Sequence, residues 1–248
     1  MPTLISPLSW ADMPGVSIET DSEVVGLGVR ALLTPVLGEL WRTGAGVGGV
    51  RTLSVDLGAF REVRTVVLEA PRDGLLPEAG AAIQVQLSAL GMGQAEAGYF
   101  SGPLALPAGY WGWVLQDAVM ARYLRLRLTS AQPYLQFGRL WVGGGLWCPR
   151  NLSESGYDPT TSDTAAMATL RRMQVTLPGL TQDQADQLDD IGFAAGTERQ
   201  ILAIARSERV TRTTVIGKLV AIPAAKPRQA WNAGGLMHTA TLTIQEDR

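Results

Sequence analysis

Ala121-Arg-Tyr-Leu-Arg-Leu-Arg-Leu-Thr129 is the stretch that decides the fold of this chain. Its side chains alternate along the backbone: Leu124, Leu126 and Leu128 share one face, and Tyr123, Arg125 and Arg127 share the other. A period of two is typical of a strand with one face in the core and the other in water. The stretch therefore predicts a half-buried β-strand.

Similar segments lie on both sides of it. Tyr134–Gly143 follows after a short loop containing Pro133 and is predicted to be a second alternating strand. Upstream, further strands are expected at Arg51–Leu57, which ends at a turn at Gly58, and at Val63–Glu69 and Ile83–Leu87. Several short strands separated by turns are typical of a sandwich or barrel and not of alternating strands and helices.

Composition excludes several functions. With 248 residues, 46% of them hydrophobic and 18% charged, the chain is long enough to bury a substantial core. The net charge is -2, and the basic residues form no stripe along the sequence. Nucleic acid is therefore not an expected partner. The single cysteine, Cys148, excludes a disulfide framework and a multi-cysteine zinc site, and neither a metal nor a cofactor is expected. No signal peptide or membrane span is recognised, so a soluble chain made in the cytoplasm is expected.

The domain organisation follows from proline and glycine. Residues 1–20, with prolines at positions 2, 7 and 14, are interpreted as an extended arm, followed by a β-sandwich over 21–145. Gly143-Gly-Gly145 is interpreted as a flexible joint that leads into a linker over 146–165.

The remaining residues, 166–248, predict a smaller β-rich domain. Strands are expected at Leu170–Leu177, Ile201–Ala205, Thr214–Ala221 and His238–Ile244. Thr181-Gln-Asp-Gln184 matches a capping box and predicts one short helix ending near Gly192. The fold class expected for the whole chain is mostly all-β: a sandwich and a smaller C-terminal β domain with one short helix.

Two parts of the chain resemble known families. Leu53-Ser-Val-Asp-Leu-Gly58, Val63–Leu68 and Ala121–Leu128 resemble strands of discoidin-like, galactose-binding-like jelly-roll sandwiches. Phe137-Gly-Arg-Leu-Trp-Val-Gly143 is similar to a variant of that domain in bacteriophage tail proteins, and Leu170–Glu246 resembles the tail-tip domain of distal-tail-like proteins. No loop matches a motif of those families, so their sugar and calcium positions are not carried over.

The resemblance implies a structural protein of a phage tail tip or baseplate and not an enzyme. It implies a virion location after synthesis in the bacterial cytoplasm. The implied partners are copies of the chain in a closed ring, the tail tube, and hub and tip proteins. We expect the arm, residues 1–20, to become ordered on a neighbour, so that deleting residues 1–15 leaves a folded monomer that forms no rings.

An alternative function is a carbohydrate-binding module that recognises a host surface glycan. Tyr110, Trp111 and Trp113 are the candidate contact residues, because aromatic rings stack on sugars, pack against neighbouring subunits or fill a core. A third hypothesis, a polysaccharide hydrolase, needs a pair of carboxylates beside a cleft, and the acids of this sequence form no recognisable pair.

The remaining candidate residues favour structural roles. Trp141 and Trp147 flank the glycine joint and are predicted to clamp the two domains together. Gly44, Gly46 and Gly49 match a phosphate-loop spacing, but they precede a strand instead of a helix and so predict a flexible loop. The only histidine, His238, shares a strand face with Leu242 and Ile244. The acids of the predicted helix, Asp183, Asp186, Asp189 and Asp190, are interpreted as a solvated face.

Overall fold

The structure is a computed structural model. It describes residues 2–36, 39–69, 75–91, 97–107, 110–148, 157–162, 170–228 and 237–246. The chain divides into two compact units: the sandwich unit, Ser9–Gly144, and the terminal unit, which combines Met1–Leu8 with Gly145–Asp247. Both are built mainly from antiparallel strands, which confirms the mostly all-β class. No helix among the described residues is long and apolar enough to span a membrane.

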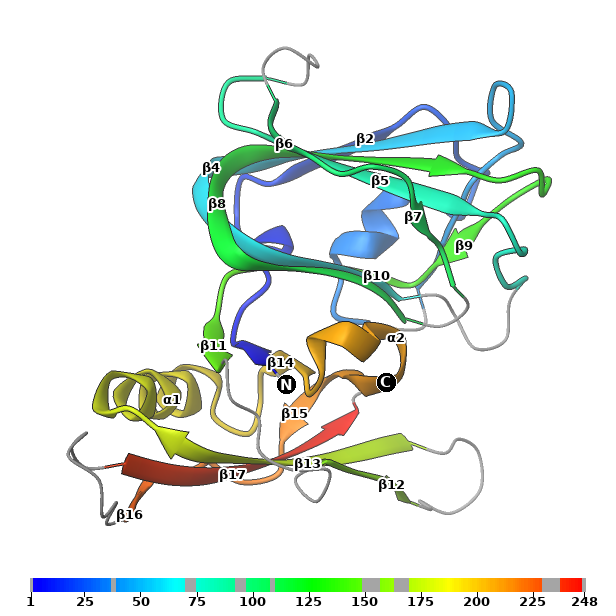
Figure 1. The fold of residues 1–248 in the computed structure, drawn as a ribbon. Coiled ribbons are helices and arrows are strands. Elements are labelled where there is room, and N and C mark those ends of the chain that lie inside the picture. Colours follow the sequence, from blue (N-terminus) through cyan, green and yellow to red (C-terminus); the bar gives the residue numbers. More distant parts are fainter. Residues whose placement is uncertain are drawn as a thin grey trace. The chain divides into compact units, whose positions relative to one another are not determined.

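Two strands of twenty residues each, β4 (Val50–Glu69) and β8 (Tyr110–Thr129), organise the sandwich unit. They pair with each other along both of their halves, with register shifts between Asp56 and Arg61 and between Val63 and Thr65. Bulges of this kind bend a strand pair. The two strands therefore turn over together from one layer to the other (Figure 1).

Each half of the β4–β8 pair forms a sheet with different neighbouring strands. The first half of β4 and the second half of β8 form one layer, in the order β2-β4-β8-β5-β6, with β2 (Ser17–Thr20), β5 (Ala82–Ser88) and β6 (Ala97–Phe100). The short β7 (Leu104–Ala105) also pairs with β5. The other halves form the second layer with β10 (Arg139–Gly143).

Smaller elements complete this unit. A two-stranded pair joins β3 (Trp41–Arg42) to β9 (Gln136–Phe137). Two 3-10 helical turns, η1 (Trp10–Asp12) and η2 (Val29–Leu33), accompany the sheets. The sandwich layers enclose an apolar core.

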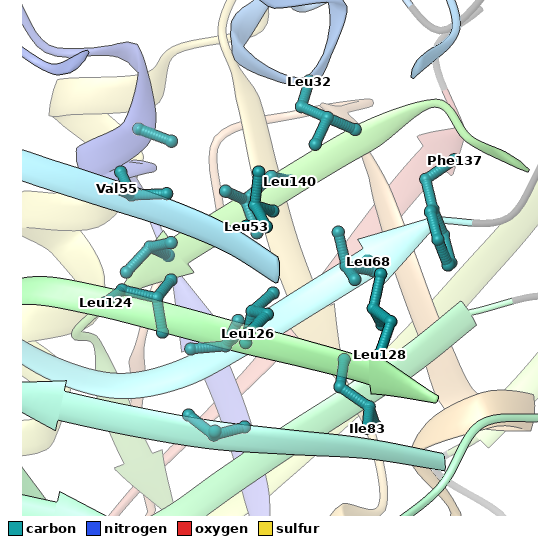
Figure 2. Close-up of a cluster of buried hydrophobic side chains, with 14 of the residues drawn as sticks. Leu32, Leu53, Val55, Leu68, Ile83, Leu124, Leu126, Leu128, Phe137 and Leu140 are labelled. Atoms are coloured by element: carbon teal, nitrogen blue, oxygen red, sulfur yellow. The ribbon is translucent and has the colours of Figure 1, made fainter. Parts of the chain in front are cut away.

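Alternating leucines form the centre of that core. Leu124, Leu126 and Leu128 are fully buried and lie among Leu53, Leu68 and Ile83 (Figure 2). Burying one such side chain contributes about 1.5–3 kcal/mol. The alternation predicted for Ala121–Thr129 is confirmed, because the two arginines between these leucines remain partly or fully exposed.

The structure differs from the sequence predictions at two places in this unit. Gly58 does not end a strand: with φ 71° it sits where β4 bends, and a Cβ there would meet the carbonyl oxygen of Gly15 at 2.9 Å. Along Tyr134–Gly143 the predicted alternation is wrong, because every residue of β10 is buried. That strand pairs with the second half of β4, in the layer opposite Ala121–Thr129.

The terminal unit contains one sheet in the order β11-β1-β14-β15-β17-β13-β12, with β16 paired to β17. Its strands are β1 (Thr3–Ser6), β11 (Leu146–Cys148), β12 (Tyr157–Ser162), β13 (Leu170–Leu180), β14 (Gln200–Ile204), β15 (Thr214–Leu219), β16 (Lys226–Arg228) and β17 (Met237–Glu246). The short helical segments η5 (Ser207–Arg209) and α2 (Val210–Thr213) connect β14 to β15. The four predicted strands correspond to β13, β14, β15 and β17.

Helix α1 (Gln182–Ala195) has the predicted capping box. The Thr181 hydroxyl accepts from the Gln184 backbone N–H at 3.2 Å, and the Gln184 side chain accepts from the Thr181 N–H at 3.1 Å. Leu188, Ile191 and Ala195 are buried in the core of the unit. The helix ends three residues later than predicted, before Gly196 at φ 55°.

Residues 1–20 are part of the folded units and not an arm. β1 pairs with β11 on one side and β14 on the other, and Leu4 and Ile5 are almost completely buried. Ser17–Thr20 pairs with β4 in the sandwich unit. The units meet in sequence after residues 8 and 144, instead of 20 and 145, and the expected linker begins with strand β11. Prolines flank β1 without preventing its pairing.

Candidate functional site

A row of polar side chains crosses the outer face of the five-stranded layer. The strand registers place five residues from neighbouring strands in one line: Glu19, Ser54, Arg125, Gln86 and Phe100. Residues that are paired directly across strands lie on the same face of a sheet. Because the leucines adjacent to these positions along β4 and β8 point into the core, this row faces outward.

A second row runs beside the first. Arg127 of β8 pairs with Thr52 of β4 and with Gln84 of β5. Asp21 extends the row, since its Oδ1 accepts a hydrogen bond of 2.8 Å from the Thr52 N–H. These two rows line a hollow of about 620 Å³, which we call the polar groove.

The charges of the polar groove are segregated. Both acids, Glu19 and Asp21, belong to the β2 edge, whereas Arg125 and Arg127 occupy the central strand β8. Arg127 is exposed, and among the described residues its guanidinium makes no hydrogen bond or ion pair. An arginine fork without an internal partner has its donors available for a ligand.

The aromatic ring of Phe100 lies at the end of the first row. Phe100 keeps 51% of its surface exposed, although it pairs directly with Gln86, which is only 5% exposed. An exposed phenylalanine next to amide and guanidinium groups combines a flat apolar surface with directional donors and acceptors. That combination suits a ligand with both apolar faces and hydroxyl groups.

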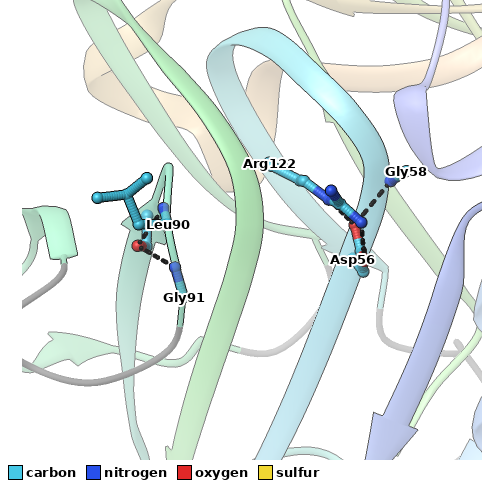
Figure 3. Close-up of polar contacts among 6 residues, drawn as sticks. Asp56, Gly58, Leu90, Gly91 and Arg122 are labelled. Atoms are coloured by element: carbon cyan, nitrogen blue, oxygen red, sulfur yellow. Dashed lines mark hydrogen bonds and ion pairs between the residues drawn. The ribbon is translucent and has the colours of Figure 1, made fainter.

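Polar contacts hold the neighbouring row, which contains Asp56 and Ser88, in place (Figure 3). Arg122 donates to both carboxylate oxygens of Asp56, at 2.8 and 2.9 Å, and the Gly58 N–H adds a third bond of 2.8 Å. The hydrogen bond from Arg122 lowers the pKa of Asp56. Ser88 Oγ accepts from the N–H groups of Leu90 and Gly91, at 3.3 and 3.1 Å. These bonds fix side chains of the row next to the groove, outside its lining.

The candidate contact residues lie elsewhere. Tyr110, Trp111 and Trp113 belong to the other half of β8 and are only 3–7% exposed. Trp113 donates from Nε1 to the hydroxyl of Tyr99 at 3.3 Å, and the two rings are 4.8 Å apart. Trp111 and Trp113 belong to the hydrophobic core of the unit, as in the core alternative, and Tyr110 is buried outside that cluster.

The two tryptophans of the predicted clamp belong to different units. Trp141, in β10, is fully buried, with the guanidinium carbon of Arg139 5.8 Å from its ring centre. Trp147, in β11, is partly buried, and its carbonyl accepts a hydrogen bond of 3.3 Å from Gln184. The clamp itself stays a prediction.

Gly46, His238 and Cys148 lie in surroundings that indicate roles in the fold. Gly46 has φ 72° just before the turn at Val47–Val50, and a Cβ there would lie 2.5 Å from the Val50 carbonyl oxygen. The His238 Nε2 atom is 2.9 Å from Gln182 Oε1. Burial raises the pKa of the Cys148 thiol to about 12, so it is not a nucleophile. Within the described ranges, no cluster of three or more His, Cys, Asp or Glu side chains could hold a metal ion.

Sequence reasoning missed the polar groove. Its signal was present in three strands whose alternate positions are polar: Thr52 and Ser54, Gln84 and Gln86, Arg125 and Arg127. Each pair indicates only that its own strand has one outward face. Strand order and register, which depend on the β4–β8 bend, are needed to bring the pairs together.

Comparisons with known proteins give only distant similarities. No protein-family model and no curated protein matches the sequence. Among solved structures, the chain is similar to a family 32 carbohydrate-binding module of Clostridium perfringens NanJ in complex with galactose, with 14% identity, a TM-score of 0.43, and coverage of 57% of this chain and 98% of that one. It is also similar to a Streptococcus pneumoniae fucose-binding module, with 15% identity, a TM-score of 0.44, and coverage of 55% and 94%. Similarities at this level say nothing about what this chain binds.

Proposed function

We propose that this protein binds carbohydrate in the polar groove of its sandwich unit, without chemical turnover. The observation that carries this proposal is the strand register, which assembles two amides, two guanidiniums, two carboxylates and one exposed aromatic ring on a single concave face. Function depends on such a site and not on the fold that presents it.

The chemistry of these groups matches a sugar. A sugar ring offers hydroxyl groups, which both donate and accept hydrogen bonds, and an apolar face of C–H groups. Gln84 supplies a donor and an acceptor on one planar group, Arg127 supplies donors only, and Glu19 supplies acceptors only. Phe100 can stack against the apolar face.

The dimensions also fit. A hollow of about 620 Å³ falls within the range of roughly 300–1,000 Å³ that is usual for small-molecule sites. Neighbouring strands are about 4.8 Å apart, so the row from Glu19 to Phe100 spans about 19 Å. That length accommodates a short oligosaccharide, whose successive units can contact both the acidic edge and the aromatic end.

A glycan array followed by titration calorimetry tests the proposal. We expect binding that Phe100→Ala and Gln84→Ala each weaken by roughly tenfold, since each removes one well-placed contact. Phe193→Ala is the matched control, because Phe193 is 79% exposed and lies in the terminal unit. Undiminished binding in both groove variants, or no glycan bound by the unmodified protein, contradicts the proposal.

A second candidate function is a structural role in a phage tail tip, in a virion, joined to tail tube and hub proteins. An exposed apolar group on the terminal unit favours it. Phe193, Val220 and Ile222 are 79%, 44% and 49% exposed, and Ile222 lies against the position of Gly192, next to Phe193. Exposed apolar groups of this kind are typical of contacts between subunits.

Sedimentation velocity and electron microscopy test this second function. We expect rings that Phe193→Asp disrupts while Phe100→Ala leaves them intact, because a charge placed in an apolar contact is costly to bury. A chain that remains monomeric at high concentration argues against self-assembly. Because the two variants change different units, assembly and glycan binding are tested separately.

A further inference from the structure

We propose that the glycan held in the polar groove is acidic and that Arg127 binds its carboxylate. This inference rests on the proposed function and adds the class of sugar to it: a glycan containing a uronic or sialic acid unit. Nothing in the neutral-sugar chemistry of the site requires the charge that β8 places at its centre.

The geometry around Arg127 favours a carboxylate. Its guanidinium makes no hydrogen bond or ion pair among the described residues, and it is exposed on the face that the groove lines. A guanidinium presents parallel N–H donors that match the two oxygens of a carboxylate, and such paired bonds are stronger than bonds to a neutral hydroxyl.

The neighbours of Arg127 reinforce this preference. Gln84 and Thr52 pair with it from either side, so neutral donors, and no acids, flank the fork. Arg125 follows two residues earlier on the same face, about 7 Å along the strand. The centre of the groove is thus a short positive strip bordered by amide and hydroxyl groups.

The acids lie at the β2 edge of the groove and not directly beside Arg127. Asp21 already accepts a hydrogen bond from the Thr52 backbone through Oδ1. Glu19 is separated from Arg125 by Ser54, a distance of two strand spacings or about 10 Å. A bound glycan would therefore direct its carboxylate to Arg127, hydroxyl groups to the β2 edge and an apolar face to Phe100.

The experiment compares acids with their uncharged equivalents. Disaccharides containing glucuronate, galacturonate or sialate are titrated into the full-length protein beside the methyl ester of each, which keeps the shape and removes the charge. We expect the protein to bind at least one acid about tenfold more tightly than its ester, and the difference to shrink as salt increases.

Three variants test whether Arg127 causes the difference in affinity between the acid and its ester. Arg127→Gln should abolish the difference between acid and ester, and Arg127→Lys should retain part of it, because lysine keeps the charge and loses the fork. Arg199→Gln is the matched control, since Arg199 is exposed, carries the same charge and lies in the terminal unit. It should bind like the unmodified protein.

The outcomes separate the two proposals. Equal affinity for every acid and its ester, or an acid preference that survives in Arg127→Gln, overturns the carboxylate assignment. If neutral glycans still bind and Phe100→Ala weakens them, carbohydrate binding stands without it. Failure to bind any acidic, esterified or neutral glycan overturns both proposals.

Discussion

Arg51 donates a hydrogen bond from Nη1 to the carbonyl oxygen of Ser130, 3.1 Å away and 79 residues later in the chain. Arg51 is completely buried, and its other donors reach the carbonyl oxygens of Gly44, Gly49 and Gln132. One guanidinium thus joins loops from distant parts of the sequence at one end of the sandwich unit. Desolvation lowers the pKa of Arg51, and the nearby carboxylate of Glu78 partly offsets this effect.

Replacing Arg51 should destabilise the sandwich unit strongly. Arg51→Met removes the guanidinium donors of four carbonyl oxygens, of which Gly49 keeps its bond from the Ser130 N–H, so we expect the free energy of unfolding to fall by about 3 kcal/mol or more. Arg51→Lys should rescue little, because an ammonium group cannot reach acceptors placed around a planar fork. Urea denaturation measures both, with Arg199→Met as a surface control. A loss below about 1 kcal/mol would show that the loops do not depend on this residue.

Lowering the pH should destabilise the same end of the sandwich unit. The hydrogen bond from Ser130 Oγ, 2.8 Å long, lowers the pKa of the Glu78 carboxyl, with a further contribution from the Ala131 N–H. A carboxyl whose folded-state pKa is lowered stabilises the fold above its unfolded-state pKa, about 4.5 here, and loses that contribution as pH falls through the folded value. Unfolding curves from pH 7 to 3 should therefore be less pH-dependent for Glu78→Gln than for the unmodified protein. Identical pH dependence would refute this assignment.

Removing the buried tryptophans should unfold the sandwich instead of selectively removing a ligand contact. Because Trp111 and Trp113 are in the core, substituting either with Ala should cost about 3–5 kcal/mol. Phe100→Ala, at an exposed position, should change stability by no more than about 0.5 kcal/mol. Thermal unfolding followed by circular dichroism distinguishes the two. A Trp111→Ala protein of normal stability would be inconsistent with this core.

The first strand should be essential to the terminal unit. Leu4→Ala should destabilise it by about 2–5 kcal/mol, because Leu4 is fully buried in a strand paired on both sides. Val25→Ala is the control, since Val25 is fully exposed. Deleting residues 1–15 should expose the terminal unit to proteolysis, in contrast to the folded monomer expected of a detachable arm. A protease-resistant deletion variant would restore the arm hypothesis.

Local sequence patterns predicted the structure correctly where the pattern lies within a single segment. The alternation of Leu124, Leu126 and Leu128 predicted a half-buried strand, because burial of one face requires a period of two. Thr181 and Gln184 predicted the start of α1, because a capping box is completed within four residues. Both features depend on neighbours in sequence alone.

Local patterns failed where distant segments decide the outcome. Gly58 looked like the end of a strand, but pairing with β8 continues through it and turns it into a bend. The prolines of the first twenty residues suggested an arm, but two later strands enclose β1. Pairing partners override local preference because they satisfy the backbone hydrogen bonds of the segment.

By itself, the sequence determined that the chain forms mostly antiparallel strands with alternating faces and which side of the Ala121–Thr129 strand meets water. Only the tertiary structure decided that the outward residues of that strand stand between Thr52 and Gln84, with Phe100 at the end of the row. The physical reason is that periodicity assigns a side chain to a face, whereas its neighbours on that face depend on strand order and register. These are set by long-range hydrogen bonds and core packing.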